Sequence, residues 1–174
     1  MDMPADRMRK ILFTFLIVMQ FFSGVCKQSS TAPEMEIPQQ EDISVSCSPG
    51  SGSNGTVFTV SVSLNNTWQE IKVFGMEMTF DSAIFAFREA QKGSLTGNWA
   101  DVDANEISNG KLRIGGFAGS GSPLPAGSSG VIAEIRFEVK DADAGETSRI
   151  CIDNFTDDIS VLTPAPACTD FELN

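Results

Sequence analysis

The chain has 174 residues, with 23 acidic and 12 basic side chains, a formal net charge of −11 and no histidine. This acidity disfavours nucleic acid as a partner, because phosphate backbones attract basic surfaces. The lack of histidine removes the usual Ser-His and Cys-His pairs of nucleophilic catalysis.

The N-terminal segment has the pattern of an export signal. Three basic side chains among the first ten residues precede an apolar run from Ile11 to Phe22. These twelve residues are too few for a membrane-spanning helix, which needs about 20. Small residues close the run before Cys26, so we expect residues 1–26 to be a signal peptide. The Pro-, Gln- and Ser-rich residues 27–42 are expected to be a flexible tether.

Two fates of Cys26 follow from this segment. Residues 23–26, SGVC, are similar to a bacterial lipobox, in which the cysteine is acylated and becomes the mature N-terminus. The alternative is plain secretion with cleavage nearby. We therefore expect a secreted or cell-surface protein whose contact with a membrane depends on a lipid anchor at Cys26.

The remaining residues, 43–174, show strand patterns at regular intervals and almost no helical periodicity. The expected strands are 43–48, 56–64, 71–80, 83–90, two within 110–140, 148–155 and 159–162. Residues 92–106 form a long polar connection in this reading. Short alternating strands separated by turn residues are typical of an all-β antiparallel sandwich or barrel, here one domain.

The clearest alternation lies in the segment from Gly110 to Lys140. Its last strand places Val131, Ala133, Ile135, Phe137 and Val139 on one side. Charged side chains point the other way in both strands of this segment: Lys111, Arg113, Glu134, Arg136 and Glu138. If the two strands share a sheet, these five residues form a mixed-charge face for a partner. The alternative is an ordinary solvated sheet face.

The chain has four cysteines, of which Cys26 belongs to the expected leader. The other three allow at most one intramolecular disulfide. Cys151 with Cys168 is our first expectation, because the pair closes a short loop and ties down the C-terminal segment. Cys47 with Cys168 remains the rival pairing.

No catalytic, cofactor or metal site is expected from the remaining polar residues. Asp101, Asp103 and Glu106 lie in one expected loop, whereas a glycosidase needs two carboxylates across a cleft. The same loop opens like a calcium loop, but Glu106 and Leu112 stand where glycine and the bidentate carboxylate belong. Trp68 and Trp99, both beside turns, are candidate glycan contacts if their rings are exposed and core caps if they are not.

Five blocks of sequence carry a family resemblance. They are VSVSL (60–64), MTFDSAIFAF (78–87), GSLTGNW (93–99), NGKLRIGGFAGSG (109–121) and GVIAEIRFEVKDADAG (130–145). In this order and spacing they resemble the cohesin family over about residues 43–162.

The resemblance implies a jelly-roll sandwich of about nine strands without catalytic activity, monomeric and working outside the cell. Cohesins hold dockerin modules of polysaccharide-degrading enzymes on a scaffold. The best-known type presents Asn and Asp eight and six residues before the aspartate that ends the third strand. Val73 and Gly75 stand at these places before Asp81. Dockerin-like protein recognition is the implied function, and direct polysaccharide binding is the rival.

Overall fold

The computed structural model describes residues 43–174 except 66, 68, 142 and 162–165. The expected leader, the tether and Cys26 lie outside this part of the chain. Every regular element that it contains is a strand. The strands are β1 (Ile43–Ser48), β2 (Ser51–Gly52), β3 (Val57–Leu64), β4 (Val73–Thr79), β5 (Phe85–Lys92), β6 (Asp101–Ser108), β7 (Lys111–Phe117), β8 (Gly130–Val139), β9 (Thr147–Asp157) and β10 (Ala167–Leu173).

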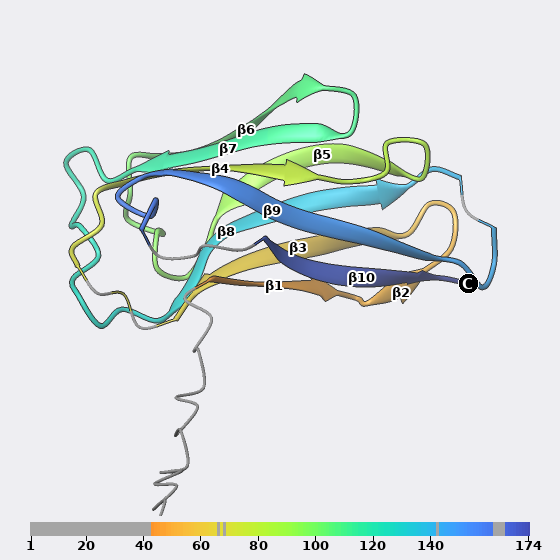
Figure 1. Cartoon of the computed structure of the whole chain (residues 1–174), viewed down its shortest axis with the longest axis horizontal. Helices are drawn as coiled ribbons and strands as arrows, with labels where there is room; N and C mark the ends of the chain where they lie inside the picture. Colours follow the sequence, from red (N-terminus) through yellow and green to blue (C-terminus); the bar gives the residue numbers. More distant parts are fainter. Residues whose placement is uncertain (1–42, 66, 68, 142, 162–165) are drawn as a thin grey trace, which may run out of the picture. The chain divides into compact units, whose positions relative to one another are not determined.

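The strands form two sheets that pack as a β-sandwich (Figure 1). The four-stranded sheet has the order β1-β3-β8-β5, and the six-stranded sheet has the order β2-β10-β9-β4-β7-β6. All pairs are antiparallel except β10 with β2, which is parallel. The expected all-β sandwich is therefore confirmed.

The core is the apolar layer between the two sheets. Alternation along β3 buries Phe58, Val60, Val62 and Leu64, and the serines and threonine between them face outward. Aromatic rings join the layers, since Phe58 of β3 lies 4.1 Å, centroid to centroid, from Phe171 of β10. A closely packed aromatic pair adds about 0.5–1.5 kcal/mol beyond the area that it buries.

Strand β8 departs from simple alternation at one residue. Val62 pairs with Ala133 and Ser63 with Val131, so Ile132 is the extra residue of a β-bulge. A bulge turns the extra side chain relative to its neighbours. Ile132 is buried here, although its expected place was on the outward side of β8.

The segment 93–100 is anchored on this bulge by a buried hydroxyl. Thr96 Oγ1 donates to the carbonyl of Ile132 at 2.7 Å and accepts from the backbone N–H of Gly93 at 2.9 Å. The Thr96 side chain is inaccessible to solvent.

Several expected boundaries were wrong. Residues 101–108 form β6 and are not part of a loop, residues 158–161 form a turn where a strand was expected, and β10 was not anticipated. Within the described part of the chain there is no helix long and apolar enough to cross a membrane.

We expect Thr96→Val to destabilise the fold by about 1–3 kcal/mol, because the isosteric side chain leaves buried backbone groups without their partner. Thr59→Val, on the outer side of β3, is the matched control and should change stability by no more than about 0.5 kcal/mol. The measurement is the midpoint of urea unfolding at constant m. Equal midpoints for the two variants would contradict the anchoring role of Thr96.

Candidate functional site

The candidate site is the solvent side of β9, β4, β7 and β6, which we call the six-stranded face. Strand β4 lies between β9 and β7, so its outward side chains occupy the middle of this face. They are Val73, Gly75, Glu77 and Thr79, alternating with the core residues Phe74, Met76 and Met78. The same alternation therefore supplies both the core and the site.

A row of small side chains crosses the six-stranded face. Gly75 pairs with Thr156 of β9 on one side and with Gly115 of β7 on the other. Gly115 in turn pairs with Asp103 of β6. Because two neighbouring strands carry glycine at the same level, the sheet surface is hollow there.

Two concavities of about 370 and 460 Å³ meet at this row. Both are lined by Arg113 and Gly115. The first extends over Gly75 toward Thr156 and Asp157, and the second extends over β6. We call the combined depression the glycine groove.

The two sides of the glycine groove differ in chemistry. One side is polar, because Glu77, Arg113 and Asn105 stand at the same level on β4, β7 and β6. The other side is apolar at its centre, where Val73 pairs with Phe117. Val73 is 37% exposed and Phe117 49% exposed, so both present apolar surface to solvent.

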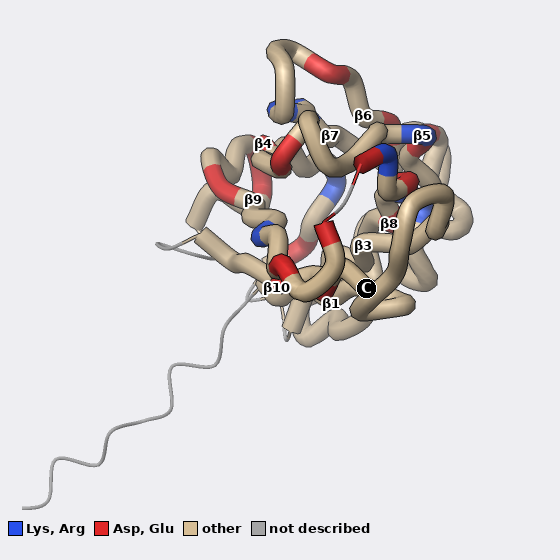
Figure 2. Tube along the Cα trace, turned by 90° about the vertical axis from the view of Figure 1, so that its right-hand side faces the viewer, with Lys and Arg blue, Asp and Glu red and all other residues tan. Residues whose placement is uncertain are grey.

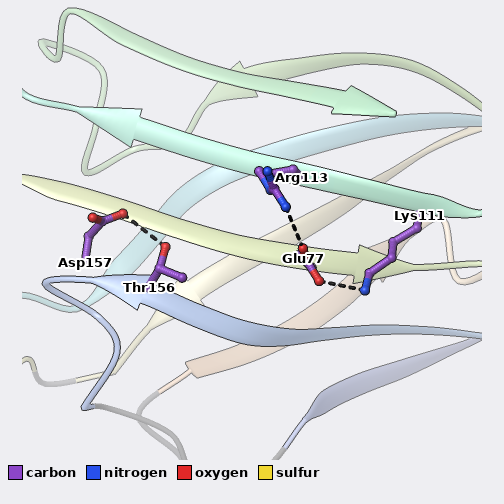
Figure 3. A network of polar contacts seen from close by, with 5 residues as sticks. All are labelled: Glu77, Lys111, Arg113, Thr156 and Asp157. Atoms are coloured by element: carbon purple, nitrogen blue, oxygen red, sulfur yellow. Dashed lines mark hydrogen bonds and ion pairs between the residues drawn. The ribbon is translucent and has the colours of Figure 1, made fainter. Parts of the chain in front are cut away.

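The polar side is organised around Glu77 (Figure 3). Its carboxylate lies 2.6 Å from Lys111 Nζ and 3.1 Å from Arg113 Nη2, and only 9% of its side chain is exposed. Hydrogen bonds from Lys111, then Arg113 and Asn154, lower the pKa of Glu77 to about 2. The carboxylate in turn raises the pKa of Lys111. Glu77 therefore stays ionised and holds both cations close to the sheet.

The groove ends in acidic side chains. Asp157 accepts from Thr156 Oγ1 at 3.0 Å on β9, and Asp101 and Asp103 stand on β6. Figure 2 shows acidic positions recurring around the sandwich. Among the described residues, Asp101, Asp103 and Asp157 take part in no ion pair.

The structure divides the expected mixed-charge face into two. Lys111 and Arg113 lie on β7 in the six-stranded sheet, whereas Glu134, Arg136 and Glu138 lie on β8 in the four-stranded sheet. The expected face required β7 and β8 to share a sheet. They do not, because β8 pairs with β3 and β5. Two of the three β8 charges pair with β5 instead, in the ion pairs Arg88–Glu138 and Arg136–Glu89.

Trp99 is not available as a glycan contact. Its side chain is 2% exposed, packs 5.6 Å from Phe74 between ring centroids, and donates from Nε1 to the carbonyl of Ser122 at 3.2 Å. Of the two alternatives for Trp99, the structure therefore supports the core cap and contradicts the glycan contact. Trp68 lies outside the described residues.

The cysteines lie away from the glycine groove. Cys151 of β9 and Cys168 of β10 are joined by a disulfide across neighbouring strands. Cys47 is a free thiol whose pKa is raised by burial. Across the described ranges, no three His, Cys, Asp or Glu side chains come together in a way that could hold a metal ion.

Sequence reasoning missed the apolar side of the groove. Phe117, Val73 and Ile107 are exposed on the six-stranded face, yet none was a candidate. A signal for Phe117 was present, because period-two alternation from Lys111 and Arg113 continues through Gly115 to Phe117. Ile107 was missed because residues 92–106 were expected to be a loop, and no strand was expected where β6 lies.

Comparison with known proteins points to one family. A sequence model of the cohesin domain matches residues 43–166. Curated protein sequences give no significant match.

Several solved structures share this fold. The sixth cohesin of scaffoldin B from Acetivibrio cellulolyticus, in complex with a mutant Cel5 dockerin, is 24% identical, with a TM-score of 0.58 over 76% of this chain and 99% of its own. The third cohesin of ScaC from the same organism, in complex with a ScaB dockerin, is 25% identical, with a TM-score of 0.55 over 70% and 93%. The cohesin of the Coh-OlpA–Doc918 complex from Clostridium thermocellum is 21% identical, with a TM-score of 0.61 over 76% of this chain and 99% of its own.

The Glu77 cluster predicts a pH-dependent contribution to stability. Because the pKa of Glu77 falls from 4.5 to about 2 on folding, the contribution is fully present above pH 4.5 and is lost as the pH falls toward 2. Wild type should therefore resist urea better than Glu77→Gln at pH 7, with the difference shrinking between pH 4.5 and 2. Asp141→Asn, an exposed charge outside the cluster, is the control. A constant difference across this pH range would disprove the ion-pair account.

Proposed function

The chain belongs to the cohesin domain family and is a non-catalytic binding module, and from that premise we propose that it binds a protein partner on the six-stranded face. The observation that carries this proposal is exposed apolar surface beside a depression in the middle of a sheet. Phe117 is 49% exposed although it stands on an interior strand. Aromatic residues next to pockets are typical anchors of protein interfaces.

We propose a dockerin or a dockerin-like module as the partner. Support comes from the three similar cohesins described above, all of which were solved with dockerins. Val73 and Gly75 stand where the best-known cohesins present Asn and Asp, so neither side chain can form those hydrogen bonds. Recognition by this chain then rests on apolar contact with Val73 and Phe117 and on polar contact with Glu77 and Arg113.

We further propose that the protein works outside the cell. The disulfide between Cys151 and Cys168 supports this location, because disulfides persist in oxidising compartments. An export leader at residues 1–26 agrees with it, and acylation at Cys26 would keep the module at a membrane surface.

We expect Phe117→Ser to weaken binding of a dockerin partner by about 2 kcal/mol, or roughly 30-fold in Kd, because it removes the exposed aromatic anchor. Val57→Ser is the matched control, since Val57 is 42% exposed on β3 of the other sheet. The measurement is calorimetric titration of the full chain with a panel of purified dockerin-bearing enzymes. The same variants are run on insoluble polysaccharide.

If Phe117→Ser binds the selected dockerin as tightly as wild type does, the six-stranded face is not the docking surface. Retention on polysaccharide without binding to any dockerin would replace the protein partner by a glycan.

A further inference from the structure

We infer that Asp158 is a positioning residue of the proposed binding face, because it fixes the start of β4 and with it the place at which Val73 meets a partner. This inference rests on the proposed function and adds a residue that acts through Val73. It follows from the hydrogen bonds of Asp158, from the path of the chain after β9 and from the neighbours of Val73.

Asp158 joins the end of β9 to the start of β4 by several hydrogen bonds. Its carboxylate oxygen Oδ2 accepts from the backbone N–H of Lys72 at 2.7 Å and from that of Val73 at 3.1 Å. Its own backbone N–H donates to the carbonyl of Val73 at 3.3 Å. Its carbonyl accepts from Gln69 Nε2 at 2.8 Å. We call these four contacts the Asp158 clamp.

The path of the chain explains why a side chain is needed at this place. The pairing of β9 with β4 reaches as far as Asp157 with Phe74. Asp157 has a left-handed backbone conformation, with a φ of 59°. Such a residue interrupts the extended run of a strand, so the chain turns away from β4. The carboxylate of Asp158 then serves as acceptor for two N–H groups that no longer face a β9 backbone.

The clamp is held on both sides. Ile159, the residue after Asp158, is inaccessible to solvent and belongs to the core. On the β7 side, the backbone N–H of Ala118 donates to the carbonyl of Lys72 at 2.8 Å. Hydrogen bonds to an ionised carboxylate are about twice as strong as those between neutral groups. The start of β4 is therefore ordered before a partner arrives.

This order matters because Val73 forms part of the apolar side of the glycine groove. Val73 is 37% exposed and pairs with Phe117. Without an acceptor for the two N–H groups, this segment would have to become ordered when a partner binds. Ordering of an interface segment costs free energy and lowers the affinity. Asp158 therefore contributes to affinity through the order of its neighbour.

The test compares Asp158→Ala with Asp158→Asn in the full chain. The alanine variant removes the acceptor, so hydrogen exchange at the amides of Lys72 and Val73 should become about tenfold faster. The asparagine variant keeps an oxygen at the same place, and exchange should stay within about threefold of wild type. The measurement is hydrogen exchange of the ¹⁵N-labelled folded protein, followed by NMR.

Binding is measured by calorimetric titration with the same panel of purified dockerin-bearing enzymes. We expect Asp158→Ala to raise the Kd about tenfold and Asp158→Asn to restore it. Asp81→Ala is the matched control, because Asp81 Oδ1 also accepts from a backbone N–H, that of Ala83 at 2.8 Å, but beyond the other end of β4. It should lower the midpoint of urea unfolding as Asp158→Ala does and leave the Kd unchanged.

Unchanged exchange at Lys72 and Val73 in Asp158→Ala would overturn the positioning role. An equal loss of affinity in Asp158→Asn and Asp158→Ala would also overturn it, since the charge of Asp158 would then contact the partner directly. So would unfolding of the whole chain by Asp158→Ala, because the residue would then support the entire fold.

The proposed function is tested separately. A dockerin whose affinity falls with Phe117→Ser but not with Asp158→Ala would support the six-stranded face and refute the positioning role. Faster exchange in Asp158→Ala, with no dockerin bound by wild type, would support the clamp and refute the proposed dockerin partner.

Discussion

Pairing of β4 on both sides is the constraint on which the rest of the structure depends. With β9 and β7 as neighbours, the backbone of β4 is committed to the sheet, and its side chains alone decide what each surface becomes. Phe74, Met76 and Met78 fill the core. The residues between them then define the centre of the six-stranded face, so the position of the groove is fixed by the register that buries the core.

Charge pairing and shape act together on that face. Glu77 forms ion pairs with Lys111 and Arg113 on the polar side of the glycine groove, and its carboxylate offsets their charges. Without this pairing, two long cationic side chains would be free to lie over the hollow and fill it. The Glu77 cluster therefore keeps both cations to one side of the glycine groove, whose ends carry the carboxylates of Asp101, Asp103 and Asp157.

The sequence predicted the class of fold because the alternation of apolar and polar residues can be recognised within each strand by itself. It shows which side of each strand is apolar, and that placed Phe58, Val60 and Phe137 in the core correctly. It does not show which strands pair, and for this reason Lys111 and Arg113 were grouped with the charges of β8. Strand β6 was not predicted, because its inward residues Val102 and Ala104 are small and have polar or acidic neighbours. Half of the candidate site, Lys111 and Arg113, was therefore anticipated, and its apolar half was not.

The two outer faces of the sandwich differ in a way that bears on function. On the four-stranded sheet, serines face one another across β1 and β3, as Ser44 with Ser63 and Ser46 with Ser61. Opposite charges on β8 and β5 are paired there. Exposed ion pairs and hydroxyls keep their hydration at little cost, so displacing water from this face gains little free energy. On the six-stranded face, Phe117 and Val73 adjoin a hollow whose covering releases water from apolar surface. The same sandwich thus has one face suited to remain solvated and one suited to be covered.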